Sequence, residues 1–195
     1  MLSSIHPLVE RARNNKWWIT VSSFTLGAIA AGMAVGGILG LAGNALLSNL
    51  SPTTRLGITA GVVAIGGVLD LLRVEPWGSR RQVNENWIGP FRGWVYGGAF
   101  GVQLGTGVVT YVVTWGVYSI LAAEILTASA VLGVLVGAIF GLGRSLALIL
   151  AFRIDIPSRL TLFHRHMADL GPPLQRLAAL SSTGIGVLAI MGLML

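Results

Sequence analysis

Long apolar runs alternate with short charged strips along the chain. We expect five transmembrane helices, at about residues 17–47, 56–72, 93–122, 130–152 and 177–195. Each is close to or longer than the roughly 20 residues that cross a hydrocarbon core of about 30 Å. The first and third runs are longer than this, so they must tilt, kink or contain a re-entrant break. The pattern predicts an all-α, polytopic helical membrane protein with a single membrane domain over residues 1–195.

Composition supports a lipid environment. The chain is 54% hydrophobic and 10% charged, whereas soluble domains carry about 25% charged residues. We therefore expect the lipid bilayer to cover most of the surface. The net charge of +6 would suit a nucleic acid, but the arginines flank apolar runs, which membrane topology explains without such a partner. We expect no nucleic-acid partner.

Basic residues are sorted to one side of the expected spans. Eleven of the 13 Lys and Arg residues lie before the first span or in two loops, at about 73–92 and 153–176. They are Arg11, Arg13, Lys16, Arg73, Arg80, Arg81, Arg92, Arg153, Arg159, Arg165 and Arg176. By the positive-inside rule, the N-terminus and both loops are cytoplasmic, and an odd number of spans leaves the C-terminus outside. We expect a multi-pass protein of a prokaryotic plasma membrane.

Glycines recur at four-residue spacing within the spans, which places them on one helix face. Small residues on such a face let helix backbones approach closely in lipid. The pattern predicts a compact bundle or a tight association with a second copy or with other membrane subunits. The three longest ladders are Gly32, Gly36 and Gly40; Gly97, Gly101 and Gly105; and Gly133, Gly137 and Gly141.

The sequence also suggests an internal repeat. A shift of 80 residues superposes Gly57, Gly61 and Arg73 on Gly137, Gly141 and Arg153. Two crossings in each unit would make the repeat parallel. Any helical hairpin with a basic inner loop would give a similar pattern, so both explanations stay open.

Polar residues within the spans are the candidate site. Gln103, Thr106, Thr110 and Thr114 would share a helix face opposite Gly97, Gly101 and Gly105. This face either meets other polar groups or lines a narrow aqueous path. Alternatively, the threonines only bond to their own backbone carbonyls.

Arg144 is the most informative of the intramembrane polar residues, because a charge within a span costs at least about 2.5 kcal/mol. We hypothesise that Asp70 and Gln103 hold Arg144 in the bundle interior. These three residues could form a substrate or ion site, or they could only fix the helix register. Glu124 is expected to be a solvated residue at the outer end of the third span.

The strip before the last span has helical periodicity. Leu160, Phe163, Met167 and Leu170 follow helical spacing, which predicts an amphipathic helix lying on the inner leaflet.

Catalytic chemistry is not indicated. The chain has no cysteine, and we find no phosphate-binding loop, nucleophile elbow, zinc-protease motif or paired catalytic carboxylates. We expect no cofactor, no metal and no enzymatic activity.

Residues 92–115, RGWVYGGAFGVQLGTGVVTYVVTW, resemble small actinobacterial-type membrane proteins and the first segment of CcdA/DsbD-like thiol-disulfide conduits, in which a glycine-rich broken helix recurs. The resemblance covers about one span. The two working cysteines of that family and their prolines are absent, so it implies at most a cysteine-less relative.

These observations lead to two functional hypotheses. The first is a bundle that moves a small solute or ion, or the membrane subunit of such a transport system. The second is a non-catalytic structural or anchoring membrane subunit of a larger complex.

Overall fold

The computed structural model describes residues 5–78, 90–110, 112–153 and 156–194. Its helices are α1 (Pro7–Ala12), α2 (Trp17–Leu47), α3 (Pro52–Leu71), α4 (Gly93–Gly105), α5 (Gly116–Leu126), α6 (Ala130–Ile149) and α7 (Pro157–Met194), with a 3₁₀ turn, η2 (Leu150–Arg153), after α6. The all-α class predicted from the sequence is confirmed. Part of the expected cytoplasmic loop at 73–92 lies outside the described residues, including Arg80 and Arg81.

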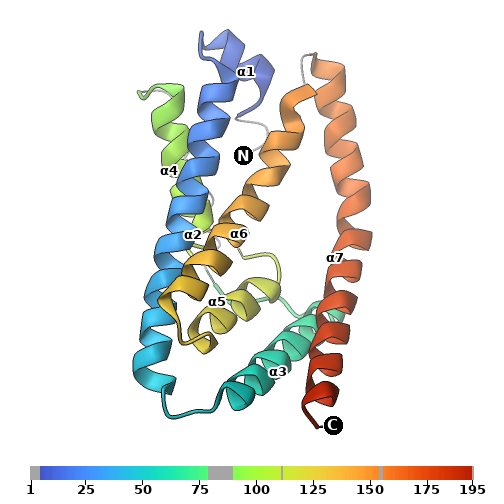
Figure 1. Cartoon of the computed structure of the whole chain (residues 1–195). Coiled ribbons are helices and arrows are strands. Elements are labelled where there is room, and N and C mark those ends of the chain that lie inside the picture. The colour runs from blue at the N-terminus through green and yellow to red at the C-terminus, as the bar shows by residue number, and fades with distance from the viewer. Residues whose placement is uncertain (1–4, 79–89, 111, 154–155, 195) are drawn as a thin grey trace.

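The long helix α2 is the centre of the bundle (Figure 1). It packs against α4, α5 and α6, whereas α7 packs mainly against α3. In Figure 1, α1 and the start of α2 lie at one end of the molecule, and the end of α7 lies at the other. α1 and the end of α7 thus lie at opposite ends of the molecule; the number of crossings and the sides of the termini stay predictions.

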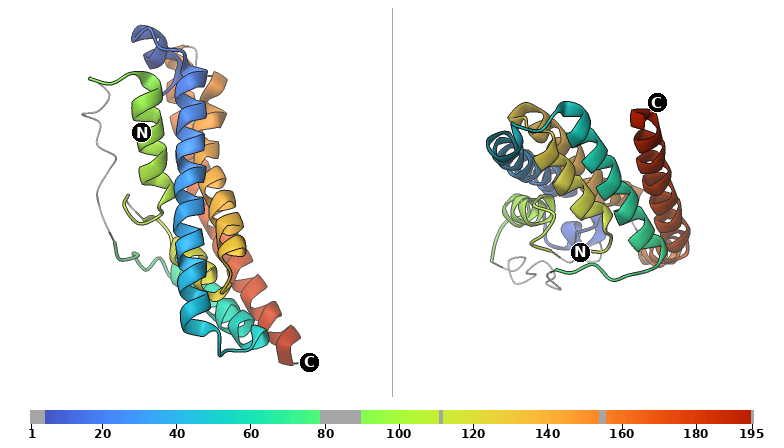
Figure 2. Two further views of the ribbon diagram at one scale, coloured as in Figure 1. Left: turned by 60° about the vertical axis from the view of Figure 1, so that its left-hand side comes forward. Right: turned by 90° about the horizontal axis from the view of Figure 1, so that it is seen from below.

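Within the described residues, four helices are long and apolar enough to cross a membrane. They lie at Trp17–Leu47, Pro52–Leu71, Ala130–Ile149 and Ser158–Met194. α3 is strongly inclined, and its last residues do not reach the end where α1 lies (Figures 1 and 2). The described chain that follows it, up to Gly78, therefore lies near the middle of the bundle.

The expected third span, 93–122, is not one helix. It is divided into α4 and α5, which occupy different halves of the bundle (Figure 2). We call residues 106–115, which connect them, the break; its residues 106–110 and 112–115 are described and are not helical. Gly107 has a φ of +80°. A right-handed helix cannot continue through this left-handed conformation, which glycine adopts more easily than other residues.

The expected loop at 153–176 is mostly helical and continuous with the last span. α7 runs through Pro172 and Pro173 without ending, so the predicted helix over this strip is confirmed, but it is continuous with the last span instead of ending before it. Prolines inside a membrane helix are tolerated because other groups can satisfy the freed carbonyls. At 38 residues, α7 is about 57 Å long, and part of it must project beyond the hydrocarbon core.

Candidate functional site

The break is held in place by the end of α3. The Asp70 carboxylate accepts a hydrogen bond of 2.8 Å from the backbone N–H of Trp115, immediately before α5. The Trp115 indole donates to the carbonyl of Val74 at 2.9 Å, and the Tyr118 hydroxyl donates to the carbonyl of Trp77. An acid at this position also suits the partial positive charge of a helix N-terminus. Asp70 thus anchors the start of α5.

The predicted polar stripe does not form one helix face, because the helix ends at Gly105. Gln103 lies on α4 and its carbonyl accepts a bond from the Thr106 hydroxyl at 2.8 Å. Thr110 is buried in the break, and its hydroxyl has no hydrogen-bond partner among the described atoms. Thr114 is partly buried just before α5. Three of the four residues therefore belong to the break.

Arg144 lies beside the break but does not form the network that we hypothesised. Its guanidinium carbon lies 5.5 Å from the centre of the Phe140 ring. That ring also abuts the break, since a Cβ on Gly107 would lie 3.2 Å from it. Among the described residues, no ion pair joins Arg144 to Asp70. The Asp70 carboxylate instead accepts the hydrogen bond from the backbone N–H of Trp115.

The glycine ladders lie at helix contacts. A Cβ on Gly32 would lie 2.1 Å from the carbonyl oxygen of Gly137, and one on Gly36 would lie 2.1 Å from that of Gly133. We call this contact between α2 and α6, formed by these four glycines, the glycine seam. The same ladders continue at Gly40, which abuts the Ser129 carbonyl, and at Gly141, which abuts Ala28.

The α4 ladder packs on the other half of α2. Cβ atoms on Gly97, Gly101 and Gly105 would lie 2.5, 2.0 and 2.2 Å from backbone carbonyl oxygens of α2. No side chain fits at these positions without moving the helices apart. Gly57 and Gly61 of α3 differ, since Gly61 has no atom within 4 Å of its Cβ position. The glycines that the proposed repeat would equate therefore have different surroundings, and the repeat stays a prediction.

A buried acid at the α1 end was missed by sequence reasoning. Glu10 is fully buried; one of its carboxylate oxygens accepts a hydrogen bond from the Tyr96 hydroxyl, and the other accepts one from Thr20 at 2.8 Å. The Arg13 guanidinium lies 4.0 Å away. The only signal in the sequence is that Glu10 is the single acid before the first span.

A second buried acid lies in the opposite half of the bundle. Glu124 of α5 is 1% exposed, so the expectation of a solvated residue is wrong. One oxygen lies 3.1 Å from the Cβ position of Gly36, and the other has no hydrogen-bond partner among the described atoms. Its apolar neighbours, Ala122, Ala123, Ile125 and Leu126, were a signal that this acid lies inside the protein.

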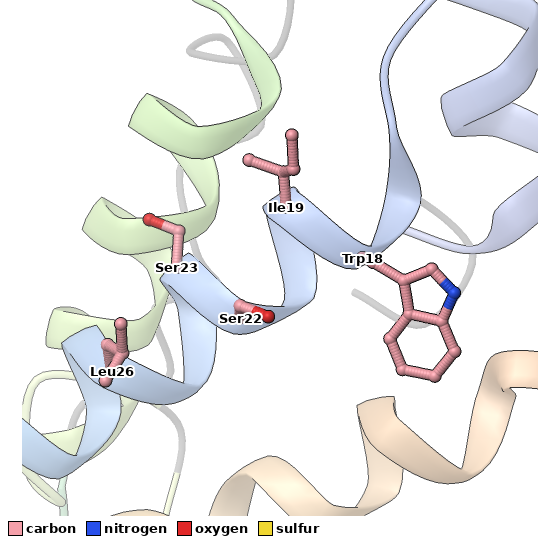
Figure 3. Close-up of a pocket in the computed structure, with 5 residues that line it drawn as sticks. All are labelled: Trp18, Ile19, Ser22, Ser23 and Leu26. Atoms are coloured by element: carbon pink, nitrogen blue, oxygen red, sulfur yellow. The ribbon is translucent and has the colours of Figure 1, made fainter.

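A hollow near the start of α2 is a feature of the outer surface (Figure 3). It is lined by α2 residues alone: Trp18, Ile19, Ser22, Ser23 and Leu26. Trp18, Ile19 and Leu26 are each more than half exposed, and the Ser23 hydroxyl donates to the Trp94 carbonyl at 2.6 Å. This hollow suits a lipid chain better than a solute path.

The fold defines a polytopic helical membrane protein with an interrupted helix. Residues 3–188 match the family described as the cytochrome c biogenesis protein transmembrane region, and the chain belongs to this family. No solved structure matches it.

The curated relatives are bacterial proteins of one name. The methylamine utilization protein MauF of Paracoccus versutus is 35% identical over 152 residues, which cover 74% of this chain and 54% of the relative. MauF of Paracoccus denitrificans is 35% identical over 126 residues, covering 64% and 44%. MauF of Methylorubrum extorquens is 32% identical over 123 residues, covering 62% and 43%. The chain spans about half the length of the relatives it matches.

Proposed function

We propose that this chain moves a small solute or ion across a prokaryotic plasma membrane, as the membrane part of a biogenesis system, and that the break is the site of passage. The observation that carries this proposal is irregular backbone in the middle of an otherwise helical bundle. In lipid, such backbone is tolerated only where it is buried in protein or lines an aqueous cavity. Interrupted helices also form the substrate sites of many transporters.

The polar groups at the break support this proposal. The Thr110 hydroxyl has no partner among the described atoms, and water or a solute in the break would supply one. Arg144 adds a positive charge on the neighbouring helix, separated from Gly107 by the Phe140 ring. The family name, cytochrome c biogenesis protein transmembrane region, supports the biogenesis part of the proposal, and the MauF relatives are named for methylamine utilization. Dithiol exchange is not part of this proposal, because these 195 residues include no cysteine.

We propose that the basic segments face the cytoplasm. The start of α2 and the first half of α7 lie at the same end of the bundle (Figure 1). They carry Lys16, Arg159 and Arg165. The gathering of these three residues at one end supports a cytoplasmic position for that end under the positive-inside rule, although Arg73 lies nearer the middle of the bundle.

Single cysteines test the aqueous path, and the cysteine-free sequence provides a clean background. We would introduce cysteine at 103, 106, 110 and 114 in separate full-length chains, in lipid nanodiscs, and add a charged thiol reagent. We expect labelling at 110 and 114. Val102→Cys, at an exposed position on α4, is the lipid-facing control and should stay unlabelled. No labelling at any of the four positions, with Ser48→Cys labelled at the end of α2, would overturn the proposal.

An anchoring subunit is the second candidate function, and α7 is the observation that favours it. α7 packs mainly on α3, and much of its apolar surface is uncovered, at Leu174, Leu177, Leu180, Ile185 and Leu188. A partner helix could cover this surface as well as lipid does. A chain that aggregates when purified alone, but is homogeneous with a co-expressed membrane partner, would favour anchoring over transport.

A further inference from the structure

Glu124 combines burial with an unmet hydrogen-bonding requirement. It lies on α5, 1% exposed, with one oxygen against the Cβ position of Gly36 in the glycine seam. Its other oxygen has no partner among the described atoms. A buried carboxylate usually accepts several hydrogen bonds or pairs with a cation. Nothing in the described part of the structure supplies either one to this oxygen.

Few charged groups surround Glu124. The helix α2 has no charged residue between Trp17 and Leu47. On α6, Arg144 is eleven residues beyond Gly133, which corresponds to about 16 Å along the helix. On α5 itself, the Tyr118 hydroxyl is bonded to the carbonyl of Trp77.

The helix α3 contributes one acid and one base next to α5. Asp70 is bound at the opposite end of α5, to the N–H of Trp115. Arg55 is near the Glu124 end, where it donates to the carbonyl of Thr127 at 3.4 Å, and its Nε has no partner among the described atoms. No ion pair within 4.0 Å joins Arg55 to Glu124 in the described residues. Arg55 is therefore a cation near the Glu124 end of α5 that forms no ion pair with Glu124 in the described residues.

These surroundings favour the neutral acid while the glycine seam is closed. An unpaired carboxylate in a low-dielectric interior is strongly unfavourable, so the group keeps its proton. Ionisation would require water or the Arg55 guanidinium to reach the carboxylate. On the side of the glycine seam there is no room for either one, because the backbones of Gly36 and Gly133 are in direct contact. We therefore expect loss of the proton and separation of the helices to occur together.

We propose that Glu124 is a proton-binding site whose ionisation opens the contact between α5 and the glycine seam. The carboxylic acid gives its proton to water that enters the opened contact, and the resulting carboxylate is stabilised by that water and by Arg55. Reprotonation closes the contact again. This inference rests on the proposed transport function and makes the proton the ion that controls it.

Infrared difference spectroscopy tests the proton site directly. The full chain in lipid nanodiscs is titrated with pH, and the carbonyl band of a protonated carboxylic acid is followed. We expect a band that disappears as pH rises and that is lost in Glu124→Gln and shifted in Glu124→Asp. Glu10→Gln is the matched control at the other buried glutamate and should keep the band. A spectrum that is unchanged in Glu124→Gln would overturn the proposal.

Thiol labelling tests the opening of the seam. Val134→Cys places a single thiol on α6 at the residue that contacts Gly37 of α2. The labelling rate of Ser48→Cys also rises with pH, and this variant is the control for the thiol's own ionisation. We expect the rate of Val134→Cys to rise at least about tenfold more than that of the control, since each unit of pH changes the ionised fraction of an acid by up to tenfold. Glu124→Gln should abolish the excess. If the labelling rate of Val134→Cys rises as steeply with pH in the Glu124→Gln background, ionisation of Glu124 does not open the seam.

The two proposals can fail separately. If cysteines in the break are labelled but Glu124 does not titrate, the aqueous path stands and the proton site is wrong. If Glu124 titrates and the break stays unlabelled, the proton site stands and the path through the break is wrong.

Discussion

The two halves of α2 each lie against a buried glutamate, and the two glutamates differ in their surroundings. Near the start of α2, Glu10 accepts hydrogen bonds from Tyr96 and Thr20, with Arg13 beside it. In the other half, Glu124 has one oxygen against the glycine seam and another without a partner. Both acids are excluded from water, but only Glu10 is satisfied by the protein.

This difference shows why burial alone does not identify a functional group. Glu10 joins α1, α2 and α4 at one end of the bundle, and this role accounts for its hydrogen bonds. The described neighbours of Glu124 do not use its carboxylate to join helices in this way. The same degree of burial therefore indicates a structural residue in one half and a group available for proton exchange in the other.

The largest effect is expected from filling the glycine contacts. Gly36→Ala would place a Cβ 2.1 Å from the Gly133 carbonyl oxygen, and Gly101→Ala would place one 2.0 Å from that of Phe24. Each should destabilise the bundle by about 1–3 kcal/mol, the usual cost of overpacking. Reversible unfolding in mixed detergent micelles measures this cost. Gly143→Ala, where nothing lies within 4 Å, is the control and should be neutral or stabilising; equal losses in all three would contradict the assignment of tight contacts.

Neutral substitutions of the two glutamates separate their roles. Glu10→Gln should cost about 1–3 kcal/mol, because the amide replaces one of the two oxygens that accept from Tyr96 and Thr20 with an NH₂ group that cannot accept. Glu124→Gln should change the free energy of unfolding little, since a neutral amide replaces an acid that is neutral when buried. Unfolding of the two variants at neutral pH gives both values. A larger loss from Glu124→Gln than from Glu10→Gln would reverse the comparison.

A smaller effect is expected from pH at the α1 end. Burial lowers the pKa of His6 below its ordinary value of 6.5, with help from the positive charges of His164 and Arg13, while Glu10 acts in the opposite direction. The docked α1 therefore favours neutral His6, and its stability is complete above about pH 6.5 and declines as the pH falls below that value.

Labelling of a single cysteine at the buried position Ile5 measures this undocking of α1. We expect Ile5→Cys to react faster as pH falls from about 7 to about 5, opposite to the ordinary trend for a thiol, which is more reactive as the thiolate. His6→Gln should remove the effect. A rate that only falls with decreasing pH in the parent would show that His6 does not control the docking of α1.

The sequence predicted the fold class and the small residues at the helix contacts well. Apolar length and glycine spacing are local properties, and both follow from what lipid requires of a helix. The extent of each helix was less predictable. Gly171 and Pro172 suggested a loop, but α7 continues through them. Membrane helices tolerate proline more readily than soluble ones, so the local signal for a helix end was weak here.

The candidate site was predicted only in part. The polar residues between 103 and 114 were found, and a break in the third run was among the expected alternatives, but the shared helix face was argued for a continuous helix. The sequence could not show that the helix ends near Gly107, because this segment contains several other glycines that remain helical. We paired Arg144 with Asp70 only from the depths at which they were expected in the membrane. The sequence cannot show that the Asp70 carboxylate accepts a hydrogen bond from the N–H of Trp115. Glu10 and Glu124 depend on contacts between distant segments, which one sequence cannot show.

Hydrogen exchange in lipid nanodiscs tests the central claim most directly, namely that water reaches the break while the glycine seam is dry. The measurement compares backbone amides of residues 108–110 with those of Gly32–Gly40 in the same protein. We predict rapid exchange in the break and strong protection along α2, because only amides that meet water exchange. Protection of residues 108–110 equal to that of α2 would mean that the break is sealed, and the account would be wrong.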